Sequence, residues 1–139
     1  NLPQYQVSKP KENYKVKISS SVKSIRPFTA CAIVTNLSFN DEKIKQIIDM
    51  QEKLHLTIGR NRKKAAIGIY PLEKISLPIS YEARTPENIK FIPLEYDKEL
   101  SAQQILNRHP TGKEFSHLLH KLEKYPVFVD SKNKILFGA

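Results

Sequence analysis

Hydrophobic residues recur at helical spacing in one long stretch of the chain, residues 41–58. The apolar positions on this stripe are Ile44, Ile47, Ile48, Leu54 and Ile58. Asn40 stands where an N-cap belongs, and Asp41 and Glu42 place negative charge at the positive end of the helix dipole. Gly59 suits the left-handed position that commonly follows the last helical residue. The pattern therefore predicts one long helix that ends at a glycine.

Other stretches have the patterns of strands. Residues 14–18 alternate apolar and lysine positions with a period of two, which is typical of a half-buried strand. The continuous apolar run at 28–34 is typical of a strand buried on both faces, and residues 65–70 are expected to form a second apolar strand. Two apolar runs within residues 126–137, separated by the polar residues 130–133, predict a β-hairpin.

Prolines divide the middle of the chain into short pieces. Between them we expect strands at residues 77–81 and 89–94. Pro78 cannot donate a ladder hydrogen bond, so the first of these strands is expected at the edge of a sheet.

Two short helices are expected near the C-terminal end. Ser101 and Gln104 have the spacing of a capping box, and Pro110 is expected to end the helix that they open. Thr111 and Glu114 repeat this spacing for the next helix. The apolar face of that helix consists of Phe115, Leu118, Leu119 and Leu122.

These elements predict an α+β fold. Mixed sheets of short strands are combined with one long helix and two short helices. Residues 1–13 are expected to be an extended lead-in, because Pro3 and Pro10 exclude a helix there. Residues 14–139 are expected to form the folded domain.

The formal net charge of +9 indicates which classes of partner suit this domain. It favours nucleic acid, an anionic membrane or an acidic protein, although a domain that is merely rich in lysine has the same charge. No apolar run reaches the length of a membrane span, so we expect no membrane partner. The single cysteine, Cys31, excludes an internal disulfide framework and a cysteine-based zinc site, and we expect it to be a buried, inert thiol. The first residue is Asn1, so we expect a piece of a longer intracellular chain.

The basic segment after the long helix is the first candidate site. It contains Arg60, Arg62, Lys63 and Lys64, whose side chains can neutralise RNA phosphates. The alternatives are a solvated loop, or arginines paired with carboxylates on neighbouring parts of a larger assembly.

His109 and His117 are the second candidates, because histidine can transfer protons near neutral pH. No acidic or nucleophilic residue lies at a spacing typical of a catalytic pair with either histidine, so a packing role is favoured over a catalytic role. The four histidines form no metal-ligand pattern, and we predict no metal site. The sequence also has no glycine-rich nucleotide-binding motif.

Four ordered blocks of sequence carry a family resemblance. They are SIRPF at residues 24–28, QEKLH at 51–55, GRNRKKAAIG at 59–68 and HPTGKEFSHLL at 109–119, the last followed by KYP at 124–126 and VDS at 129–131. In this order and spacing they resemble the β subunit of archaeal and eukaryotic phenylalanyl-tRNA synthetase. The likeness covers about residues 3 to 136.

The resemblance implies a function in translation. The family attaches phenylalanine to its tRNA with ATP and magnesium, as a cytoplasmic α2β2 enzyme whose synthetic centre lies on the α subunit. The β subunit carries an editing domain that hydrolyses tyrosine misattached to phenylalanine tRNA. This chain resembles the N-terminal part of that domain, so we expect no ATP site and no cofactor in it.

The same resemblance guides the assignment of sites. The basic segment becomes a candidate tRNA contact, and His109 and His117 become candidates for supporting an editing pocket. We assign no catalytic residue, because the family's pocket residues are expected mostly beyond Ala139, and the ending at residues 137–139 departs from the family pattern. The isolated chain is therefore expected to be inactive. The alternatives are a purely structural scaffold domain of the β subunit, or a free-standing basic RNA-binding module.

Overall fold

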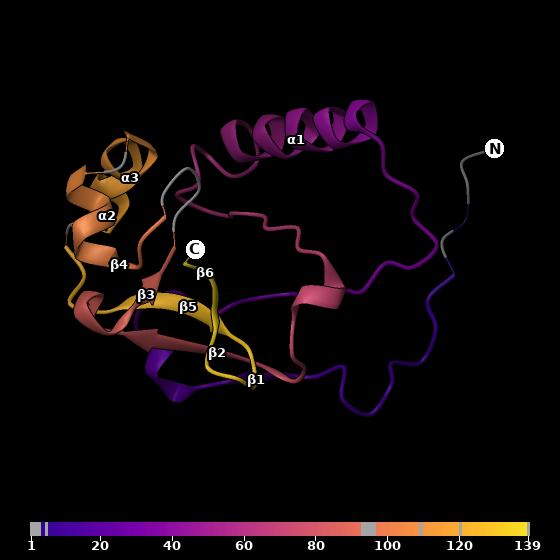
Figure 1. Ribbon diagram of the computed structural model, residues 1–139, viewed down its shortest axis with the longest axis horizontal. Helices are drawn as coiled ribbons and strands as arrows, with labels where there is room; N and C mark the ends of the chain where they lie inside the picture. Colours follow the sequence, from indigo (N-terminus) through magenta and orange to yellow (C-terminus); the bar gives the residue numbers. More distant parts are fainter. Residues whose placement is uncertain (1–3, 5, 93–96, 109, 120, 139) are drawn as a thin grey trace.

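The computed structural model describes residue 4 and residues 6–92, 97–108, 110–119 and 121–138. Its main sheet has four strands in the order β1-β2-β5-β6 (Figure 1). These strands are β1 (Val16–Ile18), β2 (Ile79–Arg84), β5 (Tyr125–Val129) and β6 (Ile135–Gly138). β1 runs parallel to β2, and the other neighbours are antiparallel, so the sheet is mixed. A second, two-stranded sheet joins β3 (Lys90–Phe91) to β4 (Leu100–Ser101).

One long helix and two short helices accompany the sheets. They are α1 (Asp41–Leu56), α2 (Ala102–Arg108) and α3 (Pro110–Phe115). Single 3₁₀ turns occur at Ser20–Val22, Leu72–Lys74, Pro86–Asn88 and Ser116–Leu118. In Figure 1, α1 runs along one side of the molecule, whereas α2 and α3 lie at the end where β3 and β4 pair. The α+β fold class is confirmed.

The hydrophobic core lies between the main sheet and α2. Its buried members are Ile89, Ala102, Val127, Val129 and Ile135. On the other part of the sheet Tyr81 is buried and stacks on Phe128, with 4.7 Å between the ring centroids. The Tyr81 hydroxyl donates to the Arg26 carbonyl oxygen over 2.8 Å, which ties the segment after β1 to the centre of the sheet.

The predicted caps at Asn40 and at Ser101 are confirmed. The Asn40 side-chain oxygen accepts from the Lys43 N–H over 2.9 Å at the start of α1. Ser101 and Gln104 form the reciprocal pair of a capping box, because each backbone N–H donates to the other's side-chain oxygen. These bonds use groups within one helical turn, which is why sequence spacing is sufficient to find them.

Two predicted strands, at residues 28–34 and 65–70, are wrong. Both segments are described, and neither pairs with a strand in either sheet. Phe28 is 90% exposed, and Cys31 is exposed instead of buried. A strand needs a partner for its backbone groups, and an apolar run in the sequence cannot show whether that partner lies close by.

The interpretation of Pro78 as a mark of an edge strand is also wrong. β2 pairs with β1 on one side and β5 on the other, so it is a central strand. The strand begins at Ile79, one residue after the proline, so the missing N–H lies outside the ladder.

The helix boundaries near Pro110 differ from the prediction. α2 ends at Arg108, and Pro110 is the first residue of α3. The N–H of a first helical residue makes no hydrogen bond within the helix, so the proline's missing N–H costs nothing there. Thr111 therefore lies inside α3 and not at the predicted N-cap position. Of the expected strand at 89–94, residues 90–91 form β3, and residues 93 and 94 lie outside the described part of the chain.

No helix within the described ranges is long and apolar enough to span a membrane.

Candidate nucleic-acid interface

The chain turns sharply after α1, at residues 59–64, which we call the basic turn. Arg60, Asn61 and Arg62 have φ angles of 48°, 55° and 64°, so three successive residues occupy the left-handed region. The Gly59 N–H donates to the Leu54 carbonyl over 2.8 Å, and the Lys64 N–H donates to the Gly59 carbonyl over 2.9 Å. These bonds close the turn on itself at the end of α1.

Gly59 is required here for a reason other than the one predicted. Its φ angle is not positive, so the left-handed glycine expected after the helix is wrong. A Cβ atom at this position would lie 2.6 Å from the Ala65 carbonyl oxygen and 2.7 Å from the His55 carbonyl oxygen. Both are backbone atoms, so the two arms of the turn approach too closely for any side chain.

His55 anchors the basic turn from within. It is 2% exposed, and its Nε2 accepts the Ile67 N–H over 2.8 Å. An Nε2 that accepts leaves the proton of the neutral ring on Nδ1, which lies 3.3 Å from Glu52 Oε1. The Arg62 N–H in turn donates to the His55 carbonyl over 3.2 Å. One histidine thus binds the chain on both sides of the turn.

Arg62 belongs to the scaffold of the turn. Its guanidinium Nη2 lies 2.7 Å from Glu52 Oε1, and its carbonyl oxygen accepts from Arg26 Nη2 over 3.1 Å. The sequence left open a pairing of these arginines with carboxylates on neighbouring parts of a larger assembly, whereas Glu52 lies on α1 of the same chain. Because the Glu52 charge offsets that of Arg62, this side chain is less available to a phosphate than its neighbours.

Arg60, Lys63 and Lys64 are exposed. None of them has an ion pair with a carboxylate of the described residues. Three cations on one hydrogen-bonded turn present positive charge at a fixed place, and phosphate oxygens are the ligands that such charges neutralise.

Of the two histidines proposed near an editing pocket, the structure describes only His117. His109 lies outside the described residues. His117 is exposed on the 3₁₀ turn after α3, and its Nδ1 lies 3.0 Å from the carbonyl oxygen of Glu114, three residues earlier in α3. The basic turn and His117 share no hydrogen bond in the described structure.

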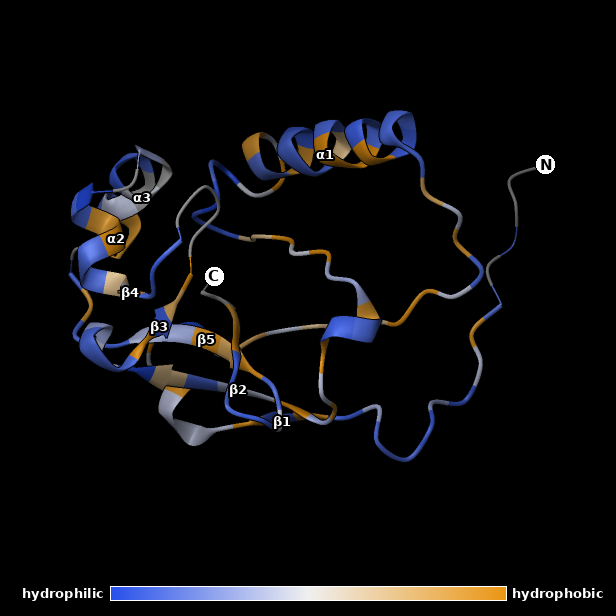
Figure 2. Cartoon of the chain, in the orientation of Figure 1, coloured by the Kyte–Doolittle hydropathy of each residue, from blue (hydrophilic) through white to orange (hydrophobic). Residues whose placement is uncertain are grey.

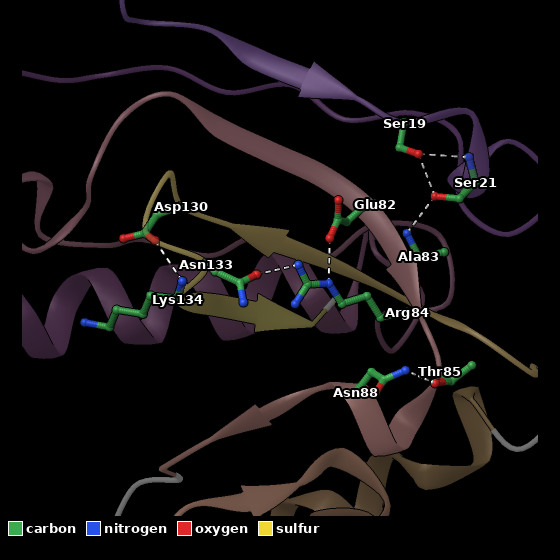
Figure 3. Close-up of polar contacts among 10 residues, drawn as sticks. All are labelled: Ser19, Ser21, Glu82, Ala83, Arg84, Thr85, Asn88, Asp130, Asn133 and Lys134. Carbon is green, nitrogen blue, oxygen red and sulfur yellow. Dashed lines mark hydrogen bonds and ion pairs between the residues drawn. The ribbon is translucent and has the colours of Figure 1, made fainter.

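A polar pocket at the C-terminal end of β2 was missed by sequence reasoning. It has a volume of about 540 Å³ and is lined by Ala83, Arg84, Thr85, Asn88, Lys124 and Asn133. Arg84 is held there by Glu82, 2.5 Å from its Nε, and by Asn133, 2.7 Å from its Nη2 (Figure 3). The lining comes from three separate stretches of the sequence, so no spacing in the chain signals it.

Known proteins resemble this chain in sequence and in structure, although no family model matches it. The phenylalanine–tRNA ligase β subunit of Thermococcus sibiricus is 44% identical over 97% of this chain and 24% of its own length. That of Methanothrix thermoacetophila is 38% identical over 97% of this chain and 25% of its own. A crystal structure of an N-terminal fragment of the phenylalanyl-tRNA synthetase β subunit from Pyrococcus horikoshii superposes with a TM-score of 0.90 and 39% identity, over 99% of this chain and 39% of that one.

The chain spans about a quarter of the length of these curated relatives. The matches extend over nearly all of its residues and agree with the four sequence blocks. The resemblance is therefore confirmed, and this chain belongs, as a segment of about quarter length, to the family of archaeal phenylalanine–tRNA ligase β subunits.

Proposed function

We propose that this chain is part of the editing region of a phenylalanine–tRNA ligase β subunit and that its basic turn contacts the phosphates of phenylalanine tRNA. The intact subunit would act with an α subunit in the α2β2 enzyme, which uses ATP and magnesium elsewhere. Editing would remove tyrosine from mischarged tRNA. The supporting observation is the hydrogen-bonded turn, in which buried His55 and the Glu52–Arg62 pair fix the backbone that carries three exposed cations.

The first experiment measures tRNA affinity of a ligase that carries this sequence in its β subunit. Arg60, Lys63 and Lys64 are replaced together by glutamine. We expect weaker binding of phenylalanine tRNA and a shallower dependence of log affinity on log salt, by about 0.7 to 0.9 for each lost phosphate contact.

A matched control removes the same charge elsewhere. Lys15, Lys17 and Lys23 are also exposed and lie in or beside β1 and the 3₁₀ turn that follows it, so their replacement by glutamine changes the net charge equally. If the two triple variants bind tRNA alike, or if the salt dependence of the first is unchanged, the basic turn does not contact the tRNA.

A scaffold function is the second candidate, favoured by the many large hydrophobic side chains that this chain exposes. Release of tyrosine from mischarged tRNA distinguishes the two. We expect slower release when the three cations are replaced. Normal release in that variant and in His117→Ala would favour a scaffold that takes no part in editing.

A further inference from the structure

Two extended segments, residues 28–34 and 65–70, form no backbone–backbone hydrogen bonds with the residues that the structure describes. No backbone hydrogen bond joins residues 28–34 to another described residue. In residues 65–70 the Ile67 N–H is bound by His55 Nε2, and no other backbone bond to a described residue is formed. Both segments have the composition of strands, with β-branched and other apolar residues in unbroken runs.

Large hydrophobic side chains are exposed along the same part of the molecule. Phe28 is 90% exposed, Ile69 53% and Ile48, on α1, 51%. Others with substantial exposure are Val34, Leu37, Phe39, Ile44 and Ile67. In Figure 2 the hydrophobic residues of α1 lie mainly on its side toward the extended segment that follows the basic turn, and in this view both extended segments cross the region between α1 and the main sheet. Exposed apolar groups gathered in one region are typical of an interaction surface.

The longer relatives indicate what covers this surface. The matched β subunits are about four times as long as this chain. The Pyrococcus horikoshii fragment follows the same course over 99% of this chain, although most of its polypeptide lies outside the superposed part. The extended course is therefore the one that these residues adopt when more of the β subunit is present.

A second copy of this chain fits the surface less well. Each copy carries a formal charge of +9, so two copies repel one another on approach. Docking of a segment from the same polypeptide also costs less entropy than binding of a free partner, because the effective concentration of the segment is high.

We propose that residues 28–34 and 65–70, with the exposed apolar side of α1, form the docking surface for another segment of the β subunit. That segment contributes apolar side chains and at least one strand that pairs with an extended segment, so a sheet separate from the two described above is formed only in the longer polypeptide. This proposal rests on membership of the family and not on tRNA binding by the basic turn.

Amide hydrogen exchange tests the proposal with two proteins. One is this chain alone, and the other is the Thermococcus sibiricus β subunit in which this chain replaces the matched segment. We expect amides of residues 28–34 and 65–70 to exchange at least about tenfold more slowly in the long protein, because they become hydrogen-bonded there. Amides of β2 and β5 should be protected in both proteins, which shows that each is folded.

Variants show whether the apolar side chains matter. In the long protein, Phe28→Ser and Ile69→Lys should restore fast exchange in their own segments while β2 and β5 stay protected. Val7→Ser is the matched control, because Val7 is 96% exposed in the lead-in and should change nothing.

Two results would overturn the proposal. One is equal exchange of the two extended segments in both proteins, with β2 and β5 protected. The other is a dimer of this chain alone, seen by sedimentation, in which these segments are already protected, because the occupant would then be a second copy.

Discussion

At the scale of single residues, Asp130 holds the connection between β5 and β6. It is buried, and its carboxylate accepts the N–H groups of Lys134, Lys132 and Ser76 over 2.8, 2.9 and 3.2 Å. Figure 3 shows the bond to Lys134 beside the polar pocket. Burial alone would raise the pKa of Asp130, but these three backbone donors and the Lys134 charge outweigh it and hold the pKa below its ordinary value.

The lowered pKa gives Asp130 a defined effect on stability against pH. The ionised group stabilises the fold fully above the ordinary carboxyl pKa of about 3.9, and this contribution is lost as the pH falls through the lower folded-state pKa. We expect Asp130→Ala to lower the free energy of unfolding at pH 7 by about 1–3 kcal/mol, because buried N–H groups lose their acceptor. Denaturant unfolding at pH 7 and between pH 5 and 2 measures both effects.

The control for this prediction is Asp49→Asn, which removes an exposed carboxylate from α1. It should change stability little and leave the acid limb of the profile as in the wild type. An Asp130 variant with the same acid limb as the wild type would show that the hydrogen bonds do not favour the charged form.

At the scale of elements, the basic turn combines tight closure with left-handed backbone. Asn61 is its central residue, with φ at 55°. Asn61→Gly should keep or raise the free energy of unfolding, whereas Asn61→Val should lower it by about 1–2 kcal/mol, because a β-branched residue is strained at positive φ. Thermal unfolding of the pair checks this, and equal stability would show that the turn relaxes out of the left-handed region.

Gly59→Ala tests the other feature of the turn. The added methyl group would meet two backbone carbonyl oxygens, which cannot rotate away as a side chain would. We expect a loss of about 1–3 kcal/mol in the free energy of unfolding. Gly112 is no suitable control, because its Cβ would also meet a backbone oxygen, 2.4 Å away. A better comparison is Gly68→Ala, where the nearest atoms belong to the Tyr70 side chain and are able to shift.

At the scale of the whole molecule, stability is unevenly distributed. The buried hydrophobic cluster joins β5, β6 and α2, whereas His55 is the buried residue of α1. We expect the amides of α1 in the isolated chain to exchange at least about tenfold faster than those of β2 and β5, because local opening of α1 exposes little apolar surface. Native-state hydrogen exchange measures this, and a single rate for α1 and the sheet would show that they unfold together.

The sequence by itself determined what depends on neighbours along the chain. The Asn40 cap, the Ser101–Gln104 box and the β5–β6 hairpin follow from residues within one turn or one hairpin. The family blocks are likewise contiguous stretches. The sequence alone was therefore sufficient to predict the cations of the basic turn and the family that this chain resembles.

Only the tertiary structure decided which distant groups meet. It placed β2 at the centre of the sheet despite Pro78, paired Arg62 with Glu52, and assembled the pocket around Arg84. It also left residues 28–34 and 65–70 outside both sheets of the described part of the chain, although their pattern matches that of strands. The physical reason is the same in each case. The chemistry of an apolar or charged residue shows which kind of group it can bind. Which group it meets depends on contacts between residues that are far apart in the sequence.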